Sequence, residues 1–131
     1  MAKTGHLHAV DATTVNGVVT ARIIGPAVEE HRGNAILETV GRAIEEAADS
    51  VRALVLDFGN VTFINSSGIA CFIRLCNGLK EKGIRTIIYR PGANLGDIFR
   101  EMKLDKMFEF VETPDDLKAV LAPEGTKGSG D

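Results

Sequence analysis

The sequence is poor in cysteine, with only Cys71 and Cys76 among its 131 residues. Both fall on one predicted helix, five residues apart, so their side chains project roughly 140° apart around its axis. At that angle they can neither form a disulfide nor hold a metal ion together. This excludes a disulfide-stabilised scaffold and favours reduced thiols in a cytoplasmic protein.

Long apolar runs are also absent. The longest stretch without charge, residues 58–73, has 16 residues and includes Asn, Ser and Gly. A membrane-spanning helix needs about 20 mostly apolar residues, so we expect no membrane segment. The first residues, M-A-K-T-G-H-L-H, lack the apolar core of a secretory signal. The sequence therefore predicts a soluble protein of the cytoplasm.

Positive charge is scarce as well, because 15 Lys and Arg face 18 Asp and Glu, for a net charge of −3. No basic cluster stands out, so we expect neither nucleic acid nor an anionic membrane surface as a direct partner. The length and the 44% of hydrophobic residues suffice for one domain with its own core. Neither disulfides nor a metal ion would be needed to stabilise it.

The most informative stretch is residues 51–83. It opens with an apolar run that ends at Asp57, the pattern of a strand covered on both faces. After a turn, Asn65, Ser66 and Ser67 place side-chain oxygens at consecutive positions. These residue types are preferred at helix N-caps, so we expect a helix to begin here.

Apolar residues then recur at three- and four-residue spacing, which predicts a helix with one buried stripe: Ile69, Phe72, Ile73, Cys76 and Leu79. With Asn65 as the N-cap, Ile64 and Ile69 stand at the two positions of a hydrophobic staple. Ser66 and Ser67 then lie in the first turn, where unpaired backbone N–H groups point outward. Such a turn is preorganised to accept negative charge.

The rest of the chain alternates strands and helices after an opening hairpin, which predicts an α/β fold with a mixed sheet. We expect about five strands with about four helices packed on them. Besides the central unit, the expected elements are a strand at 7–10, a hairpin turn at 15–18, a strand at 18–24, loop or ragged helix at 28–33, a helix capped by Asn34 and ending at Ser50, a strand at 84–89, a helix at 95–103, an edge strand at 107–111, and a helix capped by Thr113 and ending near Leu121. Residues 122–131 are expected to be a disordered tail.

The residues D-F-G-N-V-T-F-I-N-S-S-G-I, from Asp57 to Ile69, resemble the signature of bacterial STAS domains, the family of anti-sigma factor antagonists. The order of the predicted elements agrees with that family over residues 1–121. The resemblance therefore implies a single STAS domain. Many phosphorylatable members have Asp where this chain has Asn65, and Asn caps a helix equally well.

The resemblance further implies a partner-switching module that is no enzyme and needs neither cofactor nor metal. By position, Ser66 would be phosphorylated by a serine kinase that is also the anti-sigma factor, and a PP2C-type phosphatase would reverse this. Asn65, Ser67, Gly68 and Ile69 would complete the partner-binding surface. The resemblance leaves the oligomeric state open.

Several alternatives stay open at this point. The chain could be a non-switching STAS subunit of a stress-sensing or lipid-transport complex. Asp57 could be the phosphoacceptor of a receiver domain, although the early strands carry no acidic pair for Mg²⁺, and we interpret Asp57 instead as a hydrogen-bond acceptor that supports the loop. Ser66 could be a hydrolase nucleophile, although no G-x-S-x-G elbow is present. Gly68 could admit a partner or fit tightly against the chain's own sheet.

Overall fold

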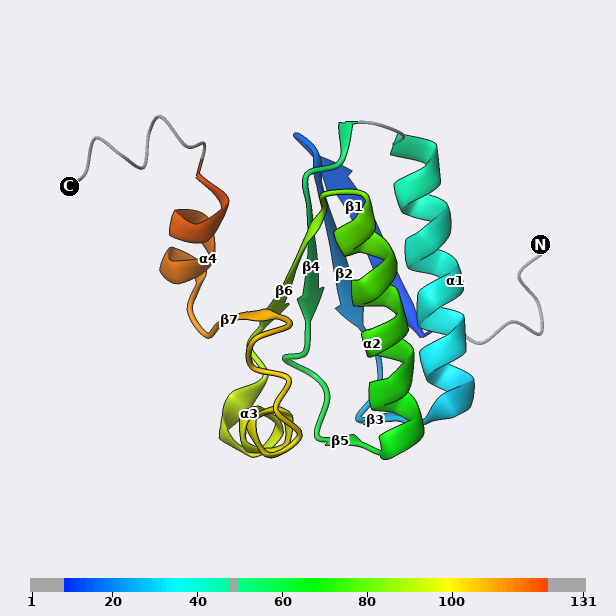
Figure 1. Ribbon diagram of the computed structural model, residues 1–131, viewed down its shortest axis with the longest axis vertical. Helices are drawn as coiled ribbons and strands as arrows, with labels where there is room; N and C mark the ends of the chain where they lie inside the picture. The colour runs from blue at the N-terminus through cyan, green and yellow to red at the C-terminus, as the bar shows by residue number, and fades with distance from the viewer. Residues whose placement is uncertain (1–8, 48–49, 123–131) are drawn as a thin grey trace.

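The computed structural model describes residues 9–47 and 50–122 (Figure 1). The elements in chain order are β1 (Val10–Val15), β2 (Val18–Ile23), β3 (Ala27–Val28), α1 (Glu30–Ala47), β4 (Ala53–Asp57), β5 (Phe63–Ile64), α2 (Ser66–Glu81), β6 (Arg85–Tyr89), α3 (Gly92–Glu101), β7 (Glu109–Val111) and α4 (Pro114–Leu121).

The main sheet has five strands in the order β1-β2-β4-β6-β7. β1 and β2 are antiparallel, and the strands from β2 to β7 are parallel to their neighbours. The hairpin turn uses Asn16 and Gly17 with φ of 50° and 80°, as the Asn-Gly pair predicts. The predicted mixed α/β sheet in a single domain is thereby confirmed.

The short strands β3 and β5 pair with each other in parallel, outside the main sheet. β3 leads into α1 and β5 leads into α2, with Val28 opposite Ile64 in the register. This pairing holds the beginnings of the two helices side by side at one end of the molecule (Figure 1).

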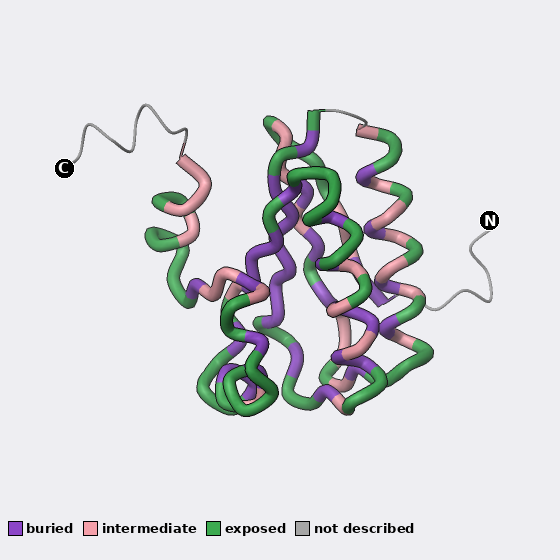
Figure 2. The backbone as a smooth tube through the Cα atoms, in the orientation of Figure 1, coloured by how far each residue is buried: buried purple, intermediate pink, exposed green. Residues whose placement is uncertain are grey.

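The core lies on both faces of the sheet, and every residue of β4 is buried (Figure 2). Leu54 and Leu56 belong to the larger cluster, which includes the inner faces of α1 and α2. Ala53 and Val55 point to the other face and form a smaller cluster, against which Leu117, Val120 and Leu121 of α4 pack. The alternation confirms the predicted strand that is covered on both sides.

The first strand lies later in the chain than the sequence pattern indicates. We expected it at 7–10, whereas β1 runs from Val10 to Val15, and residues 7–8 lie outside the described part. The two-residue hairpin loop is the reason, because it requires a strand up to Val15, which pairs with Val18.

The start of α1 is also a correction, because Asn34 is not its N-cap. The helix begins one turn earlier, at Glu30, and Glu29 Oε1 accepts the backbone N–H of Arg32 at 2.8 Å. Val28, expected in a loop or ragged helix, is a strand residue. The described helix runs to Ala47, and residues 48–49, just before the predicted end at Ser50, lie outside the described part. The position of the start of α1 depends on the pairing of β3 with β5, which is distant in the sequence. The local sequence pattern therefore does not indicate it.

The C-terminal half follows the sequence pattern more closely. α3 begins at Gly92 instead of near Leu95. The Thr113 side chain accepts the backbone N–H of Asp116 at 3.1 Å and caps α4, as predicted. β7 is an edge strand as expected, although it begins at Glu109. Except for Ala122, the predicted tail lies outside the described residues.

Candidate functional site

Asn65 is the N-cap of α2, as the sequence predicts. Its backbone is extended, with φ of −97° and ψ of 177°, and its side-chain Oδ1 accepts the backbone N–H of Gly68 at 2.8 Å. The first helical hydrogen bond runs from Ile69 N to Asn65 O at 2.9 Å. Ile64 and Ile69, the predicted staple pair, are both buried in the larger cluster. The cap and the staple together fix where the helix starts.

Ser66 and Ser67 occupy the first two positions of α2, and both are exposed. The backbone N–H groups of a first helical turn point along the axis without partners in the helix, and the helix dipole adds a partial positive charge there. The two hydroxyls therefore stand at a place that stabilises a nearby anion, and the surrounding solvent leaves them accessible.

Gly68 and Ile69 lie inside the chain's own packing. A Cβ atom at Gly68 would be 2.6 Å from the carbonyl oxygen of Val28 and 3.1 Å from Cγ1 of Ile64. Of its two interpretations, these contacts favour the tight fit, because the glycine lets the first turn of α2 lie against β3. The glycine thereby fixes the position of the two serines that precede it.

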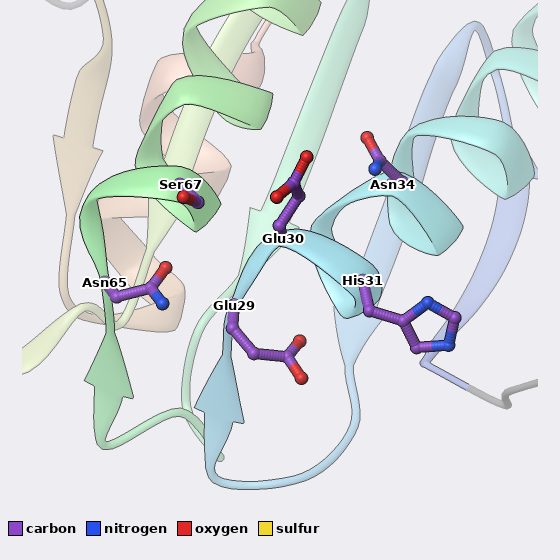
Figure 3. Close-up of a pocket in the computed structure, with 6 residues that line it drawn as sticks. All are labelled: Glu29, Glu30, His31, Asn34, Asn65 and Ser67. Carbon is purple, nitrogen blue, oxygen red and sulfur yellow. The ribbon is translucent and has the colours of Figure 1, made fainter.

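The beginning of α1 adds residues that sequence analysis did not connect with the serines. An open pocket of about 440 Å³ lies between the two helix starts (Figure 3), and its lining residues are Glu29, Glu30, His31, Asn34, Asn65 and Ser67. Glu29, Glu30 and His31 are exposed. The hydrogen bond from Arg32 N, the largest cause, lowers the pKa of Glu29 below its ordinary value of 4.5, so this carboxylate is charged at neutral pH.

Asp57 supports the segment that leads to α2. Its carboxylate accepts the backbone N–H of Gly59 at 2.9 Å and receives the guanidinium of Arg90 in a two-pronged contact, with distances of 3.0–3.2 Å. Hydrogen bonding to Asp57 raises the pKa of Arg90. These contacts tie the ends of β4 and β6 to the loop after Asp57. Arg90 was not predicted, because only the parallel pairing of β4 with β6 brings it to Asp57.

Phe63 is a second residue that the sequence did not single out. It precedes the cap by two positions, on β5, and 54% of its surface is exposed. Its backbone N–H donates to the carbonyl of Pro26 at 3.0 Å, which holds the strand in place. A large exposed aromatic side chain beside an accessible serine turn is typical of an interaction surface.

The geometry bears on the enzyme alternatives too. His31 lines the same pocket as Ser67, but Figure 3 shows its ring turned away from that serine. His6 and His8 lie outside the described residues.

Within residues 9–47 and 50–122, no group of His, Cys, Asp and Glu side chains could hold a metal ion. Over the same residues, no helix combines the length and apolarity that a bilayer crossing requires.

The fold and the site thus define an α/β domain that presents two exposed serines on a capped helix turn beside a second helix start. A family model for the STAS domain matches residues 9–117. The chain therefore belongs to the STAS domain family, as the resemblance of residues 57–69 indicated. A comparison with curated protein sequences finds no match.

Similar solved structures include an anti-sigma factor antagonist from Mycobacterium paratuberculosis, with 23% identity, a TM-score of 0.66, and coverage of 86% of this chain and 93% of that one. The phosphorylated form of the Bacillus cell fate determinant SpoIIAA has 18% identity and a TM-score of 0.65, with 87% and 100% covered. A sulfate transporter family protein from Wolinella succinogenes has 17% identity and a TM-score of 0.63, with 75% and 80% covered. At these identities the likeness demonstrates a common fold.

Proposed function

We propose that this STAS domain is a bacterial, cytoplasmic anti-sigma factor antagonist that switches partners through phosphorylation of Ser66. Without phosphate it binds an anti-sigma factor that is also a serine kinase, and so releases a sigma factor. The kinase transfers the γ-phosphoryl group of ATP to Ser66. The Ser66 Oγ forms the new P–O bond and loses its proton to a base, and ADP departs as the leaving group. A PP2C-type phosphatase restores serine and phosphate with water. The domain itself has no catalytic role.

The exposed position of Ser66 on the first turn of α2 is the observation that carries this proposal. The Asn65 side chain accepts a hydrogen bond from the backbone N–H of Gly68. The N–H groups of Ser66 and Ser67 come before the first i to i−4 hydrogen bond of the helix, which Ile69 N donates. A phosphate there would add about −1.5 to −2 charges and three acceptor oxygens. The helix start would stabilise that charge, so the modification leaves the fold intact.

The same phosphate would oppose a complex. A partner that packs closely over Ser66 removes water from the turn, and a desolvated dianion without a matched cation costs several kcal/mol, on the order of thousandfold in affinity. Phe63 lies beside this turn and would serve as the apolar anchor of the unphosphorylated complex. The phosphorylated and unphosphorylated states of one surface therefore suffice for a switch.

A non-switching STAS subunit is the second candidate, and the structural similarity to a sulfate transporter family protein favours it. In that role the surface around Phe63 and α2 would bind a scaffold permanently. The two candidates differ in one property. Only the switch requires that a phosphate on Ser66 abolish binding.

The test begins with the cognate serine kinase and ATP. Intact mass should show one added phosphate that is absent from Ser66→Ala and retained in the matched control Ser67→Ala. Binding of the Ser66→Asp variant to the kinase should be at least about a hundredfold weaker than that of the parent, or about 2.7 kcal/mol. Equal binding of Ser66→Asp and parent would leave only the scaffold role. An acid-labile phosphate lost in Asp57→Asn would support a receiver instead, and ester turnover lost in Ser66→Ala would support a hydrolase.

A further inference from the structure

The two adjacent serines, Ser66 and Ser67, raise the question of which one would be phosphorylated. Both are exposed, adjacent and carried by the same helix turn. The backbone N–H groups and the helix dipole favour an anion on either hydroxyl. Helix geometry alone therefore gives no strong preference for one phosphorylation site over the other.

The pocket between the helix starts distinguishes the two serines. Ser67 lines it and Ser66 does not. Figure 3 shows Ser67 and Glu30 on opposite sides of this space, with the Glu29 side chain below them. Among the described residues, neither Glu29 nor Glu30 forms an ion pair. A phosphate on Ser67 would thus enter a pocket whose wall already carries two carboxylates.

Besides the hydrogen bond from Arg32 N, the charges of His31 and Arg32 help to lower the pKa of Glu29, but among the described residues neither cation forms an ion pair with Glu29 or Glu30. Arg32 directs its guanidinium to the carbonyl of Ile24 at 3.0 Å. Arg74 lies two turns beyond Ser67 on α2, and its guanidinium donates to the side chain of Asn34, a residue that lines the pocket, at 3.3 Å. His31 also lines the pocket, and its ring points away from Ser67 (Figure 3).

We propose that Glu29 and Glu30 are specificity-determining residues that direct phosphorylation to Ser66, because their carboxylates disfavour a phosphate on Ser67. This inference rests on the proposed function, since it concerns the choice of hydroxyl in that same reaction. The carboxylates at the start of α1 would repel a phosphate on Ser67 more strongly than a phosphate on Ser66. Because both carboxylates are exposed to water, their effect on the phosphate should be modest. They should raise the second pKa of a phosphate on Ser67 by about 0.5, which corresponds to about a threefold change in its protonation equilibrium.

The electrostatic cause can be tested without any kinase. Phosphoserine is placed at position 66 or at position 67 of the full chain during translation, and phosphorus NMR follows each phosphate from pH 4.5 to 8. The phosphate at 67 should have the higher second pKa. The double variant Glu29→Gln/Glu30→Gln should lower that pKa by about 0.5 and change the one at 66 by less than about 0.2. Gln keeps an oxygen that can accept the Arg32 N–H, so the α1 cap is retained.

The matched control is Glu45→Gln/Glu46→Gln, which changes net charge equally at the far end of α1, about 24 Å along the helix from Glu29 and Glu30. Both glutamates are exposed, so folding should be unaffected. This control should leave both phosphate pKa values within about 0.1. Equal pKa values at 66 and 67, or a shift with the control as large as with Glu29→Gln/Glu30→Gln, would overturn the inference.

The consequence for site choice is measured with the kinase. Site-localised mass spectrometry of the early reaction should find a share of phosphate on Ser67 that is about threefold higher in Glu29→Gln/Glu30→Gln than in the parent or the control. An unchanged share would reject the directing role even if the pKa values differ. If the kinase adds no phosphate to the parent, the proposed switch fails, while the NMR titration still decides the electrostatic part.

Discussion

The beginnings of α1 and α2 lie side by side, each directly after one of the paired strands β3 and β5, and the two helices point in similar directions (Figure 1). They have the same backbone polarity but opposite kinds of cap. In α1 a charged carboxylate, Glu29 Oε1, accepts the third-position N–H at 2.8 Å. In α2 a neutral amide, Asn65 Oδ1, accepts the corresponding N–H at the same distance.

The difference shows how two equal helix ends acquire different capacities. At the start of α1, the carboxylates of Glu29 and Glu30 already supply negative charge near the positive end of the helix dipole, which stabilises them. The α2 start has no acidic residue in its first turn and presents two hydroxyls. An added anion should therefore be better tolerated at the start of α2 than at the start of α1, which agrees with the proposed assignment of the phosphate to Ser66.

The largest effect should come from a methyl group added to the glycine in each first turn. In α2, a Cβ at Gly68 would lie 2.6 Å from the backbone oxygen of Val28, whereas in α1 a Cβ at Gly33 would lie 2.7 Å from the side-chain sulfur of Cys71. A backbone yields less readily than a side chain. We expect Gly68→Ala to lower the free energy of unfolding by about 3 kcal/mol and Gly33→Ala by about 1 kcal/mol, measured by denaturant titration.

A double-mutant cycle supplies the control for this difference. Gly33→Ala combined with Cys71→Ala should cost less than the sum of the two single changes, because the smaller side chain relieves the clash. At Gly68 the shortest contact is with a backbone oxygen, which no side-chain substitution removes. A Gly68→Ala protein as stable as the parent would show that α2 does not lie against β3 as closely as described.

Removal of the α2 cap should have an intermediate effect. Asn65→Ala leaves the Gly68 N–H without its acceptor and should lower the free energy of unfolding by about 1 kcal/mol. Asn65→Asp should retain stability, since Asp caps equally well, and would make the α2 start resemble the charged start of α1. A phosphate on Ser66 of the Asn65→Asp variant would then meet a like charge, so phosphorus NMR should find its second pKa raised relative to the parent.

The smallest effect is a difference in pH dependence between the two caps. The pKa of Glu29 is lowered in the folded state by the Arg32 N–H, so its capping contribution is complete above the ordinary value of 4.5 and is lost as pH falls through the lower folded pKa. The Arg32 amide shift should follow this titration in NMR spectra. The Gly68 amide should not, because Asn65 has no proton to gain. Glu29→Gln should abolish the Arg32 transition, and its persistence would assign the transition to another group.

Much of this arrangement could be predicted from local patterns. The buried run that ends at Asp57, the Asn65 cap, the apolar stripe of α2 and the Thr113 cap of α4 each depend on residues within a few positions of one another. Capping and periodicity are short-range effects, so the sequence around each element carries the signal. The same reasoning placed Ser66 and Ser67 in the first turn of α2.

The tertiary structure alone decided what surrounds that turn. The pairing of β3 with β5 moved the start of α1 to Glu30 and brought Glu29 and Glu30 beside Ser67. The parallel register of β4 and β6 brought Arg90 to Asp57. These partners lie far apart in the chain, so no local propensity encodes their meeting. The sequence by itself determined the serine turn, and long-range strand pairing determined its electrostatic environment, because only the assembled sheet places distant side chains at one edge.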